Sequence, residues 1–157
     1  MQGKIKEIDE LKILVAKAKS DGKRVVFTNG CFDLLHRGHV HLLREAKKLG
    51  DLLIVALNSD SSVKKIKGPN RPILSRAERA ELIAALEMVD YVTAFDEPDP
   101  YKVIKELKPD VLVKGGDWAG EKIVGREIVE GCGGKVAVIP YLEGYSTTQI
   151  IERMRKE

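Results

Sequence analysis

Two histidines, His36 and His39, carry the clearest chemical signal in this sequence of 157 residues. They lie three residues apart, after an apolar strand and at the expected start of a helix, so both imidazoles share one helix face. Gly38 between them lets a ligand approach the backbone closely. Helix N-terminal amides together with two imidazoles favour a phosphate group. The alternatives are a surface pair or a metal pair, although the local sequence supplies no third metal ligand.

A lysine cluster follows the second predicted strand. Lys64, Lys65 and Lys67 lie in the segment 58–71, which we predict to be a polar, basic loop. Three lysines within four residues suit a mobile clamp on a polyphosphate. The alternative is an ordinary solvated loop, which charge runs more often are.

Two further segments combine a structural role with a chemical one. Ser146 and Gln149 have the spacing of a capping box, and a capped helix N-terminus also suits a phosphate contact through Ser146 and Thr147. Lys114 follows a buried strand and is either part of a charged core edge or a ligand contact. Cys31 is interpreted as a small packing residue, because nothing nearby in the sequence would activate its thiol.

Apolar runs and amphipathic stretches alternate along the whole chain. The pattern predicts strands at 25–27, 52–57, 91–95, 111–113 and 136–139, and helices at 5–19, 38–49, 75–86, 99–107, 123–129 and from 146 onward. This order indicates one α/β domain over residues 1–157, with a mostly parallel sheet and helices on both faces. Ligands bind beyond the carboxyl ends of such strands. The loops 28–39, 58–71, 114–118 and 140–148 should therefore form the site.

Composition excludes several classes of protein. The 27 basic and 24 acidic residues give a net charge of +3, which does not favour a nucleic-acid partner. No apolar run is long enough to span a membrane, and the charged N-terminus does not resemble a signal peptide. Cys31 and Cys132 form no metal-ligand or disulfide pattern. We therefore expect a cytoplasmic protein.

The two chemically interesting ends of the chain resemble one known family. His36-Arg37-Gly38-His39 is similar to the HxGH signature of nucleotidyltransferases related to cytidylyltransferases, and Asn29 to Leu35 resembles the preceding G-x-F-D-L-L segment. Glu143 to Thr148 resembles the E-G-I-S-T-T motif of the same family. The resemblance covers the chain from Val25 onward and leaves the N-terminal helix, residues 1–22, outside it. It implies a Rossmann-like fold.

A narrower resemblance is to the adenylyltransferase half of ADP-heptose synthases. It rests on Asn29–Asp33, Arg71-Pro72, Arg76–Arg79, Val89–Val92 and Val113–Asp117. It implies transfer of AMP from ATP to D-glycero-β-D-manno-heptose 1-phosphate for lipopolysaccharide core synthesis, by direct in-line attack with release of pyrophosphate. In that family this half is often fused to a sugar kinase. This sequence is too short to include the kinase, so we expect a stand-alone form that works with a separate sugar kinase.

One position departs from the cytidylyltransferase branch. Tyr141 stands where that branch has an arginine that helps to recognise cytosine, and this favours ATP over CTP. The alternatives are a cytidylyltransferase acting on glycerol 3-phosphate or ethanolamine phosphate, or a non-catalytic nucleotide-binding module. Intact histidines, lysines and Ser-Thr-Thr segment together favour an enzyme.

The resemblance also implies roles for the candidate residues. The predicted catalytic residues are His36, His39, Lys65 and Lys67. The predicted nucleotide-binding residues are Asn29, Gly30, Cys31, Phe32, Arg79, Lys114, Gly115, Asp117, Tyr145, Ser146 and Thr147. The predicted substrate-binding residues are Asp33, Asp60, Arg71 and Arg76, although Arg76 or Arg79 could instead pair with Glu78. Mg²⁺ would bind mainly through nucleotide phosphates, with no metal site of the protein's own, and a homodimer is expected.

Overall fold

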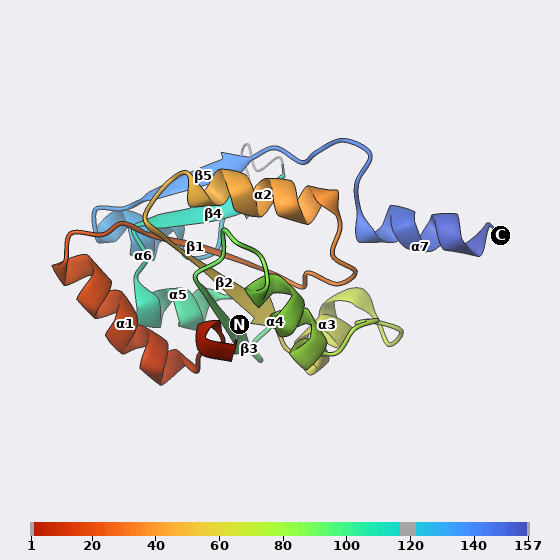
Figure 1. Ribbon diagram of the computed structural model, residues 1–157, viewed down its shortest axis with the longest axis horizontal. Helices are drawn as coiled ribbons and strands as arrows, with labels where there is room; N and C mark the ends of the chain where they lie inside the picture. Colours follow the sequence, from red (N-terminus) through yellow and green to blue (C-terminus); the bar gives the residue numbers. More distant parts are fainter. Residues whose placement is uncertain (1, 117–121, 157) are drawn as a thin grey trace.

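The fold is described here from a computed structural model, which covers residues 2–116 and 122–156 (Figure 1). The described residues contain one five-stranded sheet in the order β3-β2-β1-β4-β5. Every neighbouring pair of strands is parallel. The strands are β1 (Val25–Gly30), β2 (Leu52–Asn58), β3 (Tyr91–Phe95), β4 (Val111–Gly115) and β5 (Lys135–Ile139). The predicted α/β class and parallel sheet are confirmed.

Helices connect successive strands, as parallel pairing requires. They are the short 3-10 helix η1 (Gln2–Lys4) and the α-helices α1 (Ile8–Ser20), α2 (Arg37–Lys47), α3 (Asp60–Lys67), α4 (Arg76–Ala84), α5 (Tyr101–Leu107), α6 (Arg126–Gly131) and α7 (Thr147–Arg155). The strand order reverses direction between β1 and β4, which is the switch point where open α/β sheets bind ligands.

The hydrophobic core has two layers, one on each face of the sheet. Val26 and Val55 point into the layer covered by α2 and α4, while their neighbours Phe27 and Ile54 point into the layer covered by α1, α5 and α6. Successive strand side chains alternate between faces, so continuous apolar strands fill both layers. The predicted helices on both faces are therefore confirmed, and the sheet is a rigid support for the loops at its carboxyl end.

The loop predicted over 58–71 is wrong in its first half, because residues 60–67 form α3. Ser59 caps this helix, accepting a hydrogen bond from the Ser62 amide at 3.3 Å. Val63 is fully buried, and the Ser62 hydroxyl donates to the carbonyl of Glu97 at 2.9 Å. A cap and one buried face are enough for two helical turns, although lysines dominate the composition.

Other boundaries move by a few residues. The first helix begins at Ile8 rather than Ile5, because Ile5 bridges to Val92 of β3 and the Lys6 amide donates to the Val92 carbonyl at 2.8 Å. The helix predicted from Ile123 begins at Arg126. The predicted capping box of α4 at Ser75 and Glu78 is confirmed.

The C-terminal helix α7 extends away from the sheet (Figure 1). None of its residues is buried, and Thr147 in its first turn donates a hydrogen bond to the carbonyl of Asp33. Within the described residues no helix has the length and apolar character needed to cross a membrane. The position of α7 matters because its N-terminus borders the cleft described next.

Candidate active site

A cleft of about 750 Å³ opens at the carboxyl ends of β1 and β4. Its wall includes residues that the sequence predicts for the site: Asn29, Gly30, Cys31, Phe32, Asp33, His36, His39, Lys67, Arg71, Lys114, Gly115, Tyr145, Ser146 and Thr147. These residues come from both ends of the chain. The structure therefore brings the two predicted motif regions together, as expected for loops that follow parallel strands.

The two histidines form a reciprocal cap at the start of α2. His36 is the N-cap residue, and its Nδ1 accepts a hydrogen bond from the Gly38 amide at 3.0 Å. His39 Nδ1 in turn accepts from the His36 amide at 3.3 Å. The two rings stack with their centroids 3.8 Å apart. Each Nδ1 is thus occupied by a backbone donor, so the proton of a neutral ring lies on Nε2.

Both imidazoles are held in the neutral form near neutral pH. Burial lowers the pKa of His36, and burial together with the neighbouring His36 ring lowers the pKa of His39 to about 4. A neutral ring with its proton on Nε2 can donate a hydrogen bond to a phosphate oxygen. The pair can therefore stabilise developing charge on phosphate oxygens.

A second helix N-terminus adjoins the first. Ser146 caps α7 by accepting from the Gln149 amide at 3.1 Å, and the Thr147 hydroxyl donates to the carbonyl of Asp33 at 2.7 Å. A Cβ at Gly38 would lie 2.8 Å from His36 Cε1 and 3.3 Å from Tyr145 Cβ, so only glycine fits between these segments. The N-terminal ends of α2 and α7 thus both border the cleft, which favours an anionic ligand.

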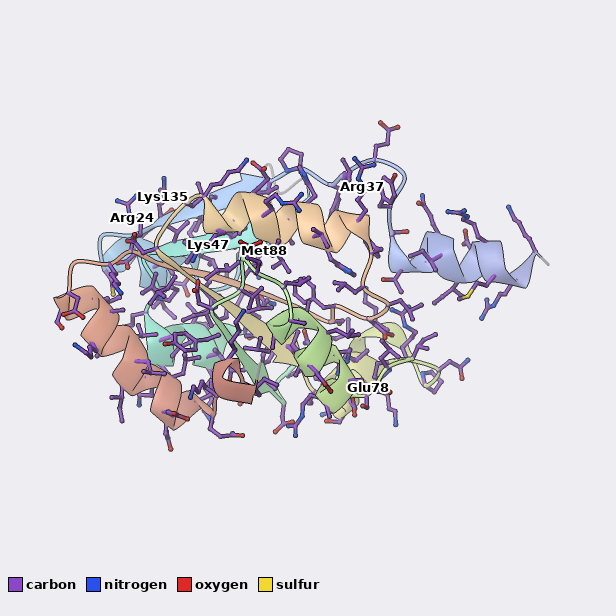
Figure 2. The ribbon with its side chains drawn as sticks, viewed as in Figure 1. Arg24, Arg37, Lys47, Glu78, Met88 and Lys135 are labelled. Carbon is purple, nitrogen blue, oxygen red and sulfur yellow. The ribbon has the colours of Figure 1, made fainter. Side chains whose placement is uncertain are left out.

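Arg37 strengthens this junction from the outside. Its Nη1 donates to the Tyr145 hydroxyl at 3.1 Å, and its guanidinium carbon lies 5.5 Å from the Tyr145 ring centroid. Figure 2 shows Arg37 at the end of α2 that faces α7. Tyr145 therefore lines the cleft from a fixed position.

Asp33 and Arg71, both predicted to bind substrate, contact each other. Arg71 Nε donates to the buried Asp33 carboxylate at 3.0 Å, and the amides of Ile73 and Leu74 donate to the same carboxylate at 2.7 and 3.0 Å. Burial opposes ionisation of Asp33, but these hydrogen bonds outweigh it and lower its pKa. Asp33 thus holds the segment 71–74 against the cleft. A substrate contact for either residue stays a prediction.

Arg79 is fully buried beneath the cleft. Its guanidinium donates to the carbonyls of Leu74, Cys31 and Asn58 at 3.1, 2.7 and 2.9 Å, and to the Asp60 carboxylate at 2.8 Å. One side chain thereby joins the ends of β1 and β2 to the segment before α4. Its contacts indicate a positioning role, and the predicted contact with nucleotide remains untested.

Three more of the predicted residues, Asp60, Lys65 and Arg76, lie outside the cleft. Lys65 is exposed on α3 and Asp60 is bonded to Arg79, and neither lines the cleft, whereas Lys67 at the end of α3 does. Arg76 lines a separate hollow of about 880 Å³ between α4, β3 and the N-terminal segment. Asp117 and the neighbouring Trp118 lie outside the described residues.

Part of the cleft wall has no predicted contact with a ligand, although most of it lies in the loops predicted to form the site, and only Leu42, Ile139 and Gln149 lie outside those loops. The additional residues are Leu42, Asn58, Ile66, Ile139, Pro140, Tyr141, Leu142, Glu143, Gly144, Thr148 and Gln149. The sequence singles out Tyr141 only because it departs from the arginine of the cytidylyltransferase branch. Its ring packs against the backbone, since a Cβ at Gly116 would lie 2.6 Å from Tyr141 Cε2. The structure gives Gly116 a positive φ of +108°, which favours glycine. The glycine pair at 115–116 was the one sign of this close approach in the sequence.

Burial raises the pKa of the Cys31 thiol, so it stays protonated and is a poor nucleophile. Within residues 2–116 and 122–156, no group of three or more His, Cys, Asp or Glu side chains is arranged to hold a metal ion. The cleft instead offers imidazole, ammonium and backbone N–H donors, which suit phosphate oxygens.

Comparison with solved structures supports the fold. A lipopolysaccharide core biosynthesis protein from Thermoplasma volcanium GSS1 superimposes with a TM-score of 0.62 and 34% sequence identity, over 80% of this chain and 100% of that one. The pantoate-beta-alanine ligase from Francisella tularensis, solved in complex with beta-gamma ATP and beta-alanine, has the same TM-score of 0.62 at 16% identity, over 96% of this chain and 76% of that one. At that identity the second likeness concerns the fold alone.

Sequence comparison gives stronger relationships. "Bifunctional protein HldE" from Geotalea uraniireducens (strain Rf4) is 54% identical over 152 residues, and its counterpart in Geobacter sulfurreducens is 52% identical over 153 residues. These matches cover 97% and 98% of this chain but 31% of each relative, so the chain spans about a third of their length. Residues 27–153 match the cytidylyltransferase-like family, and they include both histidines and the segment that leads into α7. The chain belongs to the cytidylyltransferase-like family.

Proposed function

We propose that this protein is a nucleotidyltransferase that transfers AMP from ATP to D-glycero-β-D-manno-heptose 1-phosphate, giving ADP-heptose for lipopolysaccharide core synthesis. The observation that carries the proposal is the stacked pair of neutral imidazoles at the N-terminus of α2, beside the N-terminus of α7. Similarity to HldE proteins and to a lipopolysaccharide core biosynthesis protein supports the sugar-phosphate acceptor.

The reaction needs positioning rather than a covalent intermediate. An oxygen of the sugar phosphate attacks the α-phosphorus of ATP in line and forms a new P–O bond. The bond from the α-phosphorus to the bridging oxygen breaks, and pyrophosphate leaves with the bonding electrons. The enzyme must align these groups and stabilise the extra negative charge on the α-phosphate oxygens.

The residues of the cleft divide this work between them. We assign His36 and His39 the donation of Nε2–H to phosphate oxygens at the reacting centre. The hydroxyls and amides of Ser146 and Thr147 bind the nucleotide phosphates, with Lys67 closing over them from α3. Lys65 reaches the polyphosphate only if α3 moves, because it is exposed and outside the cleft in this structure. Arg79 and Asp33 act by holding the loops in place.

The donors of the cleft fit a triphosphate that carries Mg²⁺. This cation prefers oxygen ligands and keeps several waters, so phosphate oxygens would supply most of its coordination. When bound, Mg²⁺ would neutralise phosphate charge and assist the departure of pyrophosphate. The residues described above would then hold the complex through the phosphate oxygens that remain free.

Pyrophosphate release tests the proposed function. ATP and CTP are each offered with heptose 1-phosphate, glycerol 3-phosphate or ethanolamine phosphate. We expect release only with ATP and heptose 1-phosphate. Release with CTP and a polyol or amino-alcohol phosphate would place the chain among the cytidylyltransferases, to which its family name gives some support. ATP binding without release in any mixture would instead favour a non-catalytic nucleotide-binding module.

The biological setting is also a proposal. We propose that the enzyme is a cytoplasmic homodimer and that a separate sugar kinase makes its sugar 1-phosphate. Light scattering during size-exclusion chromatography should give the mass of two chains, and a mass of one chain would exclude the dimer. Addition of a sugar 1-kinase with its sugar and ATP should replace added heptose 1-phosphate in the assay.

A further inference from the structure

The two central strands separate where the cleft begins. β1 and β4 pair at Val26 with Val111 and at Phe27 with Leu112, and backbone pairing then stops. Each strand stays paired with its other neighbour for three more positions, β1 with β2 as far as Gly30 and β4 with β5 as far as Gly115. The sheet therefore opens between β1 and β4 only.

Beyond the last backbone pair, hydrogen bonds from side chains connect β1 and β4. The Thr28 hydroxyl donates to the carbonyl of Val113 at 3.0 Å, and one residue further Lys114 Nζ donates to Asn29 Oδ1 at 2.5 Å. Asn29 and Lys114 both line the cleft. The second bridge thus brings an ammonium group to the bottom of the cleft, at the switch point of the sheet.

The Lys114 ammonium lacks a charged partner within the described residues. Its hydrogen bond goes to a neutral amide oxygen, and the carboxylate whose field acts on it, Asp99 before α5, forms no ion pair with it. An ammonium has three protons to donate, and Asn29 accepts one of them. A largely buried charge with one neutral acceptor is unfavourable unless an anion completes it.

From this geometry we infer that Asn29 positions the Lys114 ammonium to bind a phosphate group where β1 and β4 separate. The phosphate belongs to the nucleotide or to the acceptor. The inference rests on the proposed function only for that choice of ligands, since any phosphate in the cleft would meet the same group. Asn29 is then a positioning residue, because its Oδ1 fixes the ammonium on the cleft side of β4.

A pH dependence follows from the surroundings of Lys114. Burial lowers its pKa to about 8, which the field of Asp99 partly offsets. The nearby cleft histidines are already neutral in this range, because their pKa values are lowered from 6.5. Lys114 therefore loses its proton as the pH rises through about 8, and phosphate affinity should fall with it.

Calorimetric titration at pH 7.0 to 9.5 tests this inference without requiring turnover. The probes are Mg·ATP, AMP, pyrophosphate and heptose 1-phosphate. For the probe whose phosphate meets Lys114, we expect the native affinity to fall about tenfold over this range. Lys114→Arg should give an affinity independent of pH, because arginine stays charged. Lys114→Met should bind weakly at every pH.

The four probes distinguish the sources of the phosphate. A loss limited to ATP and pyrophosphate assigns Lys114 to the leaving group, a loss that includes AMP assigns it to the α-phosphate, and a loss limited to the sugar phosphate assigns it to the acceptor. Lys105→Met on the exposed side of α5 serves as the matched control and should change none of these affinities.

Asn29→Asp tests the positioning role separately. A carboxylate beside the ammonium raises the pKa of Lys114, so the fall in affinity should move to higher pH. Native affinities that are independent of pH, or Lys114→Met affinities equal to the native ones, would overturn the inference. Failure of AMP transfer with these binding results intact would count against the proposed function alone. If Lys114→Met does not fold, the loss of pH dependence in Lys114→Arg still decides the matter.

Discussion

The two ends of the parallel sheet handle charge in opposite ways. At the amino ends, an aspartate precedes each of three strands and accepts a backbone N–H from a neighbouring strand or its flank. Asp51 accepts from Arg24 at 2.7 Å, Asp90 from Leu53 at 2.7 Å, and Asp110 from Val25 at 2.8 Å. Lys47 Nζ also forms an ion pair with the Asp90 carboxylate at 2.6 Å. Figure 2 shows Arg24 and Lys135 at this end, far from Arg37 at the other.

At the carboxyl ends, the groups that face the cleft are left incomplete. Lys114 has only a neutral partner, and the Nε2 donors of two neutral imidazoles have no partner assigned among the described residues. The paired charges at this end, Asp33 with Arg71 and Arg79 with Asp60, hold loops instead. One sheet thus supplies stability at its amino end and unsatisfied hydrogen-bond donors at its carboxyl end. Changes at the two ends should therefore separate stability from activity.

The largest expected effect is on turnover. His39→Asn keeps an oxygen near the position of Nδ1 to accept from the His36 amide, but it removes the Nε2 donor. We expect AMP transfer to fall about 10²–10³-fold, as for loss of one donor to a developing oxyanion, with little change in stability. His41→Asn, which alters a histidine outside the cleft, is the matched control and should retain activity. Near-native turnover of His39→Asn would remove this residue from the mechanism.

Arg79 affects both stability and activity, because this buried side chain holds the loops that border the cleft. Arg79→Met leaves the carbonyls of Leu74, Cys31 and Asn58 without their donor. We expect a loss of about 3 kcal/mol in the free energy of unfolding, measured by urea denaturation, and weaker nucleotide binding in the folded fraction. An unchanged urea midpoint would show that these bonds are replaced by water.

The amino end gives the opposite pattern. Asp90→Ala removes the acceptor of the Leu53 amide and the partner of Lys47, so we expect a loss of about 1–3 kcal/mol in stability. Turnover per folded molecule should stay native. Glu45→Ala breaks an exposed pair with Lys48 at the end of α2, and it should leave the free energy of unfolding nearly unchanged because solvent screens exposed pairs. A turnover defect in Asp90→Ala would contradict the separation of the two ends.

Acid should destabilise the cleft through His39. Its folded-state pKa of about 4 lies below the ordinary 6.5, so between these values the unfolded chain binds a proton that the folded chain does not. The contribution of neutral His39 to the free energy of unfolding is therefore fully present above pH 6.5. It decreases as the pH falls toward 4, by about 2 kcal/mol at pH 5. Asp33 adds its loss only below its ordinary value of 3.8. Denaturation of His39→Asn across this range should show a weaker pH dependence than the native protein.

The sequence was informative wherever one local rule acted alone. The continuous apolar strands predicted a sheet covered on both faces, and the amphipathic pattern of residues 38–49 predicted the helix that begins at Arg37. The lysine-rich composition of residues 60–67 concealed α3. This helix forms because the Ser59 cap and the burial of Val63 outweigh that composition. The buried role of Arg79 could not be read from a surface-like helix face, since its partners lie up to 48 residues away. Long-range contacts of this kind decide which predicted residues reach the cleft.

The N-terminal segment has a consequence for solubility. Residues 5–6 pair with β3, the outer strand of the sheet, and α1 covers the core through Leu11 and Val15. An outer strand with free N–H and C=O groups readily recruits strands from other molecules. A chain shortened to begin after Asp21 would expose both this edge and the apolar layer beneath α1. Residues 1–21, which precede the region matched by the family, should therefore limit aggregation, although none of those that the structure describes lines the cleft.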